Sequence, residues 1–279
     1  MAEKTGSGLR VTILSDNNGT ERLAGEWGLS VLIERDDGLR VLLDAGASDL
    51  FIKNARALGK SLAGLDAAVL SHAHHDHADG FPALLREQPE LKVFVRRCAG
   101  ACCYAEKEDG LTYIGAAPEL FSEYGDRLAR VDGDREIAPG VWLIAHRGAD
   151  GASKGARERM FVKDGEGMRP DDFAHEQSLV FDTERGLCIF NSCSHAGAAE
   201  IVEEVRAALP GREVYAYVGG FHLYQKTPEE VAAFAERLKD AGVERICTGH
   251  CTGEEAFAVL KERLGDRLTQ FRVGLELEL

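Results

Sequence analysis

Short apolar segments alternate with amphipathic segments along most of the chain. Apolar runs bounded by charged or glycine-containing turns predict β-strands, and apolar residues at every third or fourth position predict helices. The expected strands are residues 10–14, 29–34, 40–44, 67–71, 91–95, 139–145, 178–182, 187–191, 213–218 and 244–248. The expected helices are residues 48–58, 80–87, 197–209 and 228–240.

These elements follow the same order in both halves of the chain: hairpin, helix, strand, helix, strand. Two such halves predict an α/β (α+β) fold in which two sheets pack face to face with helices outside, a four-layer αββα sandwich. The segment 100–176 is richer in glycine and charge, and within it residues 149–173 are predicted to form a mobile loop or cap excursion over an active site. Because no Pro/Ser-rich linker interrupts the chain, residues 1–279 are predicted to form one domain.

Composition and net charge limit the classes of molecule that the protein is expected to bind. The formal net charge of −14 argues against an electrostatic grip on nucleic acid or on an anionic membrane, so a small-molecule substrate is expected. Residues 1–10 contain no apolar signal region, and no apolar run is long enough to span a bilayer. The seven cysteines are odd in number, and Cys102 and Cys103 are adjacent, which favours reduced thiols in a cytoplasmic protein. Cys98, Cys102 and Cys103 are interpreted as small buried residues, and the oligomeric state is left open.

The segment SHAHHDHADG holds four of the nine histidines. His72 belongs to this segment and follows a predicted strand, as do His195, His222 and His250, while Asp44 ends another strand. In layered α/β folds the residues just beyond the carboxyl ends of strands gather at one edge, where ligands bind. The sequence therefore predicts one site built from these distant side chains.

Spacing within the histidine segment suggests how metal ions would be held. His72 and His74 lie two positions apart, so in an extended segment their imidazoles point the same way and can bind one ion. Asp76 and His77 continue along the loop and can reach a second ion, whereas His75 faces away. Imidazole and carboxylate ligands suit Zn²⁺, the expected ion, and are compatible with Mn²⁺ or Fe.

The His-x-His-x-Asp-His motif resembles the signature of the metallo-β-lactamase superfamily, whose fold is the αββα sandwich. The chain is also similar to one branch of it, the archaeal 7,8-dihydropterin-6-methyl-4-(β-D-ribofuranosyl)aminobenzene 5′-phosphate synthases and their bacterial relatives. This likeness extends over nearly the whole chain. It rests on NNGTERLAGEWGLSVLIE, LLDAGAS, LSHAHHDHADG, EQSLVF, SCSHAG, GGFHL and GHCTG.

The resemblance implies a binuclear metal centre with a defined set of residues. One ion would be held by His72, His74 and His195, and the other by Asp76, His77 and His250. Asp44 would support a ligand histidine from outside the metal shell. His222 would bind substrate or act as a general acid or base, and it is grouped with Asp76 as catalytic.

Three alternatives remain open at this point. His222 and His250 could exchange roles, and His175 rather than His195 could bind the first metal. Many superfamily members have a bridging aspartate or cysteine on the strand that reads IFNSCSHAG here. Without an aspartate there, Cys193 or His195 must substitute, or the second metal is weakly bound.

Two adjacent divalent cations can share a water, lower its pKa and polarise a carbonyl or phosphoryl oxygen. The sequence therefore predicts a metal-dependent hydrolase that uses a metal-bound hydroxide on a small substrate, a phosphorylated one included. His222 would protonate the leaving group or hold the oxyanion. One alternative is a pterin-related transferase resembling the synthases, in which pyrophosphate is displaced; another is a non-catalytic, metal-dependent binding protein.

Overall fold

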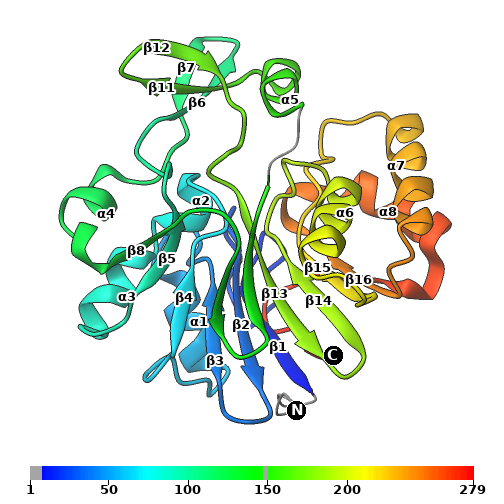
Figure 1. Ribbon diagram of the computed structural model, residues 1–279, viewed down its shortest axis with the longest axis horizontal. Coiled ribbons are helices and arrows are strands. Elements are labelled where there is room, and N and C mark those ends of the chain that lie inside the picture. The colour runs from blue at the N-terminus through cyan, green and yellow to red at the C-terminus, as the bar shows by residue number, and fades with distance from the viewer. Residues whose placement is uncertain (1–7, 147–149) are drawn as a thin grey trace.

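Two seven-stranded sheets packed face to face, with helices on both outer faces, form the body of the protein (Figure 1). This computed structural model describes residues 8–146 and 150–279. Residues 1–7 and 147–149 lie outside the described part, including the first position of the predicted 149–173 excursion. The predicted four-layer αββα sandwich is confirmed.

The strands are given in their spatial order within each sheet. The first sheet contains β18 (Glu276–Glu278), β1 (Leu9–Ser15), β2 (Ser30–Arg35), β3 (Arg40–Leu43), β4 (Ala67–Val69), β5 (Val93–Arg96) and β8 (Leu128–Val131). The second contains β17 (Leu268–Gln270), β16 (Arg245–Thr248), β15 (Val214–Val218), β14 (Gly186–Phe190), β13 (Gln177–Thr183), β10 (Val141–Ala145) and β9 (Arg135–Ala138). The helices are α1 (Leu50–Ala57), α2 (His75–Ala78), α3 (Phe81–Glu87), α4 (Pro118–Ser122), α5 (Gly151–Glu158), α6 (Ala198–Ala208), α7 (Pro228–Asp240) and α8 (Glu254–Leu264).

The strands are apolar on both faces because each sheet is covered twice. In β2, Val31 and Ile33 enter the core between the two sheets, whereas Leu32 faces the core beneath α1 and α3. The second sheet likewise packs its outer face against α6, α7 and α8. Burial on both sides explains why the sequence shows continuous apolar runs rather than strict alternation.

Parallel pairing brings the site-bearing loops to one edge. β3, β4 and β5 pair in parallel, as do β14, β15 and β16, so their carboxyl ends point the same way within each sheet. Close approach of the loops there requires glycine. A Cβ on Gly219 would lie 1.5 Å from the carbonyl oxygen of Asn191.

The segment 149–173, predicted to form a mobile loop or cap excursion, contains regular structure within its described residues. It contains α5 and two strands, β11 (Met160–Asp164) and β12 (Gly167–Pro170). These strands join β6 (Cys103–Lys107) and β7 (Gly110–Tyr113) in a third sheet of order β12-β11-β6-β7. We call α5 and this sheet the cap; it lies above the sandwich in Figure 1. Its strands are largely exposed, so they lack the apolar pattern that identified the others.

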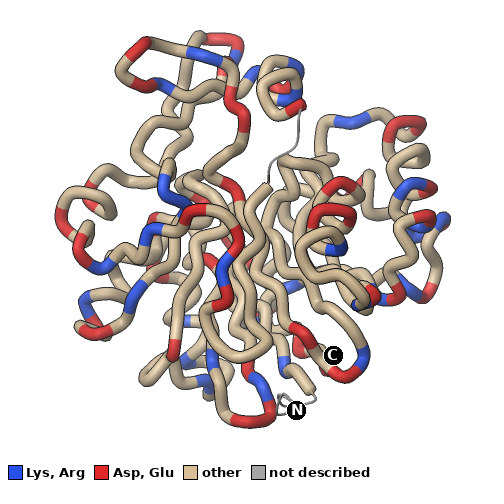
Figure 2. Tube along the Cα trace, viewed as in Figure 1, with Lys and Arg blue, Asp and Glu red and all other residues tan. Residues whose placement is uncertain are grey.

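Charged residues of both signs lie close together on the outer helices and on the cap (Figure 2). Within the part of the chain that the structure describes, no helix combines the length and the apolar character needed to cross a bilayer. The cysteine prediction is wrong for Cys98, which is exposed in the turn after β5, and Cys102 is half-buried. Cys103 is buried, as expected.

Candidate metal centre

The histidine segment after β4 changes conformation in its middle. His74 is extended, with φ −90° and ψ 151°, and its ring centroid lies 4.5 Å from that of His72. α2 begins at the next residue, which turns Asp76 and His77 in a different direction. His74 therefore precedes the helical turn that carries Asp76 and His77.

The first cluster consists of His72, His74 and His195. Each offers a ring nitrogen, and the three nitrogens lie within 4.8 Å of one another. His195 comes from the loop after β14, and all three residues are buried. Burial and the neighbouring histidines hold the pKa values of His72 and His74 well below the ordinary range, so these two imidazoles are neutral and have free lone pairs.

The second cluster adjoins the first. Asp76 Oδ2 lies 3.5 Å from His77 Nε2 and 3.3 Å from His250 Nε2, and Cys193 Sγ lies 3.2 Å from His77 Nε2. The rings of His72 and His77 are 4.2 Å apart, so the clusters form one continuous centre. Burial lowers the pKa of His77, but the carboxylates of Asp76 and Asp44 outweigh it and raise the pKa to about 10.

The hydrogen bonds of these histidines orient their free nitrogens toward the centre. Nδ1 of His72 contacts Ser71 Oγ at 2.8 Å, Nδ1 of His77 contacts Asp44 Oδ2 at 2.8 Å, and Nδ1 of His250 contacts Asn17 Oδ1 at 3.0 Å. An Nδ1–H donated outward leaves a lone pair on Nε2 for a metal ion.

Several of these buried ring nitrogens have no hydrogen-bond partner. They are His72 Nε2, His74 Nε2, both nitrogens of His195, and His250 Nε2. A buried polar atom without a partner costs about 1–3 kcal/mol, so this concentration would be unfavourable unless a ligand satisfied it. Imidazole nitrogens together with the Asp76 carboxylate form a donor set that fits divalent metal ions.

Asp44 supports this centre from the end of β3. It is buried and accepts hydrogen bonds from Ser71 N at 2.7 Å and from Ser192 Oγ at 2.5 Å, besides its contact with His77. The carboxylate thus joins the loop after β4 to the loop after β14.

Glu176 was not predicted from the sequence. Its buried carboxylate accepts hydrogen bonds from the backbone N–H groups of His195 and Ala196, at 2.9 and 2.8 Å, and so fixes the loop that presents His195. An acidic residue two positions before the predicted strand 178–182 was the available signal.

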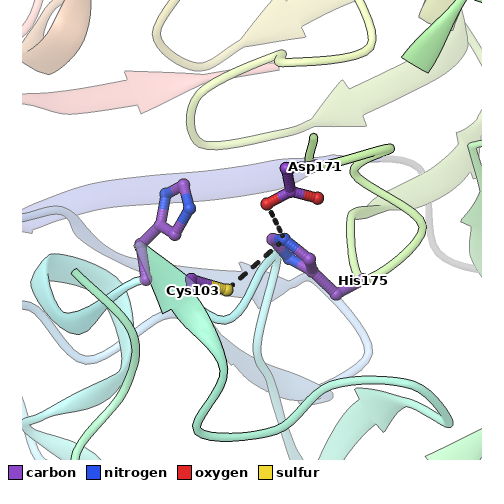
Figure 3. Close-up of side chains that lie close together, drawn as sticks. Cys103, Asp171 and His175 are labelled. Carbon is purple, nitrogen blue, oxygen red and sulfur yellow. Dashed lines mark hydrogen bonds and ion pairs between the residues drawn. The ribbon is translucent and has the colours of Figure 1, made fainter. Parts of the chain in front are cut away.

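His175 lies behind His74, with ring centroids 5.5 Å apart, rather than in the first cluster. Figure 3 shows its contacts with Asp171 and Cys103. Its Nδ1 accepts a hydrogen bond from Ala73 N at 3.1 Å, and its Nε2 lies 3.0 Å from Asp171 Oδ2 and 3.7 Å from Cys103 Sγ. Since Nδ1 is an acceptor, the ring proton of the neutral form sits on Nε2 and is donated to Asp171. His195 thus lies in the first cluster, whereas His175 forms hydrogen bonds with Ala73 and Asp171.

His222 lies beside His195 with ring centroids 4.5 Å apart, whereas His250 lies in the second cluster. Nε2 of His222 is 3.6 Å from Oε2 of Glu158, which is the last residue of α5. Burial raises the pKa of Glu158, but His195, His222 and Lys226 outweigh it and lower the pKa to about 2. No sequence signal distinguished Glu158 from other charged residues of the excursion.

A cavity of about 310 Å³ opens above both clusters. Its wall includes His75, which the sequence did not assign to either ion, and cap residues including Lys107 and Met160. Trp27 and Tyr224 also line it; they are 48% and 43% exposed, and their rings meet edge to face at 5.7 Å. A small molecule fits such a volume.

Several known proteins resemble this chain in sequence and in fold. Residues 28–155 match the model of the metallo-β-lactamase superfamily. The chain is 26% identical over 260 residues to a 7,8-dihydropterin-6-methyl-4-(β-D-ribofuranosyl)-aminobenzene-5′-phosphate synthase of Methanocaldococcus jannaschii, covering 89% of this chain and 88% of the synthase.

Two solved structures extend the comparison. The Zn²⁺-bound PqqB of Methylobacterium extorquens shares the fold at 14% identity and a TM-score of 0.56, covering 97% of this chain and 100% of PqqB. The crystal structure of a metal-dependent hydrolase of the β-lactamase superfamily matches with a TM-score of 0.81 and 30% identity, covering 97% of this chain and 99% of the hydrolase. The chain belongs to the metallo-β-lactamase superfamily.

Proposed function

We propose that this protein is a metal-dependent hydrolase that acts on a small, phosphorylated molecule at a binuclear centre, with zinc as the expected ion. The observation that carries the proposal is the pair of adjoining clusters, whose unpartnered histidine nitrogens lie at the base of an open cavity. His72, His74 and His195 would hold one ion, and Asp76, His77 and His250 the other. Cys193, placed between the clusters, is the candidate bridging residue.

When bound, two divalent cations supply Lewis acidity and lower the pKa of water. The protein's own residues supply a proton donor beside them. Burial lowers the pKa of His222, but the Cys251 thiol and the Glu158 carboxylate outweigh it and raise the pKa above its ordinary value. A raised pKa favours the protonated ring of His222, whose proton is then available to a leaving group in the cavity.

The cavity wall also favours an anionic substrate. Lys107 lies in the wall, where its ammonium group can contact an anionic group. We propose a small molecule rather than nucleic acid or a membrane as the partner, because the net charge of −14 opposes polyanion binding.

Metal analysis combined with hydrolysis of bis(4-nitrophenyl) phosphate tests this proposal. We expect two metal equivalents per chain, loss of turnover after chelation, and recovery when Zn²⁺ or Mn²⁺ is restored. His77→Ala should lose one equivalent and most activity, whereas His75→Ala, a matched change outside both clusters, should keep both equivalents. Undiminished turnover by verified metal-free protein would refute the proposal, and two bound metals without turnover on any phosphoester would favour a pure binding protein.

A second candidate is a transferase that joins a dihydropterin to a ribofuranosyl aminobenzene phosphate. Similarity to the Methanocaldococcus jannaschii synthase over 89% of this chain favours it, as do Trp27 and Tyr224, whose exposed rings can contact a flat heterocycle. A dihydropterin pyrophosphate supplied with and without the aminobenzene acceptor separates the two reactions. Coupled product identifies the transferase, and free pterin alcohol or monophosphate identifies the hydrolase.

A further inference from the structure

The carboxylate of Glu158 enters the metal centre from the cap. Its Oε2 lies 3.8 Å from Nδ1 of His195 and 3.6 Å from Nε2 of His222. This oxygen is buried and has no hydrogen-bond partner, although the side chain as a whole is 18% exposed. A buried, unpartnered carboxylate oxygen facing a predicted metal ligand indicates a role beyond packing.

α5 is held firmly enough to define where this carboxylate lies. Lys154 Nζ donates a hydrogen bond to the carbonyl oxygen of Ala196, the residue after His195. A Cβ on Gly155 would lie 2.1 Å from the carbonyl oxygen of Asp171, so the helix packs directly against that backbone. The helix ends at Arg159, whose left-handed φ of 56° turns the chain into β11.

His195 differs from His72, His77 and His250 in how its ring is supported. Nδ1 of His72, His77 and His250 each contacts a protein oxygen at hydrogen-bond distance. Both nitrogens of His195 are buried without such a partner. Shortening the distance between His195 Nδ1 and Glu158 Oε2 by about 1 Å would give a charge-assisted hydrogen bond, and such contacts tighten when a site is loaded.

We propose that Glu158 is a positioning residue for His195. Its carboxylate accepts the Nδ1–H of His195, which fixes the tautomer with its lone pair on Nε2 and aims that nitrogen at the first metal ion. The position of α5 thereby controls how tightly this ion is held, and it couples the cap to the metal centre. This inference rests on the metal centre described under the proposed function.

Three variants of the full-length protein test the coupling, each measured by competition for Zn²⁺ with a chromophoric chelator. Glu158→Gln removes the charge while preserving size, and we expect the first metal to bind about 10- to 100-fold more weakly. Gly155→Ala moves α5 without altering the carboxylate and should weaken binding in the same direction. Glu106→Gln changes an exposed cap carboxylate that pairs with Arg159, and it should leave the affinity unchanged.

Visible absorption of the Co²⁺-loaded protein separates a positioning role from direct ligation. We expect the band intensity of Glu158→Gln at saturation to equal that of wild type, because no ligand is lost. Unchanged Zn²⁺ affinity in Glu158→Gln would overturn the inference, and so would a changed coordination number. Failure of the wild-type protein to bind metal would instead refute the proposed function, so the two failures are distinguishable.

Discussion

Four non-glycine residues at the centre adopt left-handed backbone conformations: Asp44 and Ser194 with φ of 56°, and His222 and His250 with φ of 51°. Each such conformation costs about 1–2 kcal/mol and persists only where surrounding contacts enforce it. Ser194 is enforced by hydrogen bonds from its N–H to Asn191 Oδ1 and from its Oγ to the Gly220 carbonyl oxygen, at 2.7 and 2.6 Å. Backbone strain is therefore concentrated at residues that belong to the histidine clusters or adjoin them.

Asp44→Asn should weaken metal binding at the second cluster. The buried carboxylate accepts hydrogen bonds from Ser71, His77 and Ser192, and an amide would present a donor to at least one of these groups. We expect about a 10- to 100-fold loss of affinity for the second ion. Chelator competition measures it, with the exposed Asp49→Asn as control, and equal affinities would contradict a supporting role for Asp44.

Some helices and strands of this protein can be predicted from the sequence more readily than others. α7 was predicted at its observed bounds, 228–240, because its apolar residues recur at helical spacing. The structure adds the reason: Thr227 Oγ1 accepts from Glu230 N, and Glu230 Oε2 accepts from Thr227 N. The cap strands were missed because most of their side chains face solvent, which removes the alternation that identifies a half-buried strand.

Thr227→Ala should lower the free energy of unfolding by about 0.5–2 kcal/mol, because the backbone N–H of Glu230 in the first turn of α7 loses its side-chain acceptor. Urea denaturation followed by circular dichroism measures this change. Thr227→Ser retains the hydroxyl and should remain close to wild type. A serine variant as unstable as the alanine variant would show that the capping box is not responsible.

In the whole molecule, the core between the two sheets joins the halves of the chain. Phe181 and Phe190, from neighbouring strands of the second sheet, meet edge to face at 5.8 Å within a cluster that includes Val11 and Val31 of the first sheet. This packing keeps the strand ends of both sheets at one edge. The two clusters of candidate metal ligands meet at this edge.

Phe181→Ala should lower the free energy of unfolding by about 3–5 kcal/mol, since it opens a cavity in this fully buried core. Leu111→Ala, at a side chain that is 53% exposed in the cap, should change it by less than about 0.5 kcal/mol. Guanidinium denaturation compares the two. A loss below about 1 kcal/mol for Phe181→Ala would mean that the two sheets can repack around the cavity.

The sequence by itself determined the sandwich and most of its strands, because both faces of each sheet are buried and their apolar runs are local. It also marked SHAHHDHADG as a segment of candidate metal ligands, because four histidines and an aspartate lie within six residues that follow a strand. Only the tertiary structure placed His195 in the first cluster and His175 behind it, since that choice depends on loops that meet from opposite sheets. The same holds for Glu158 and Glu176, whose contacts join segments distant in sequence and leave no periodic pattern along the chain.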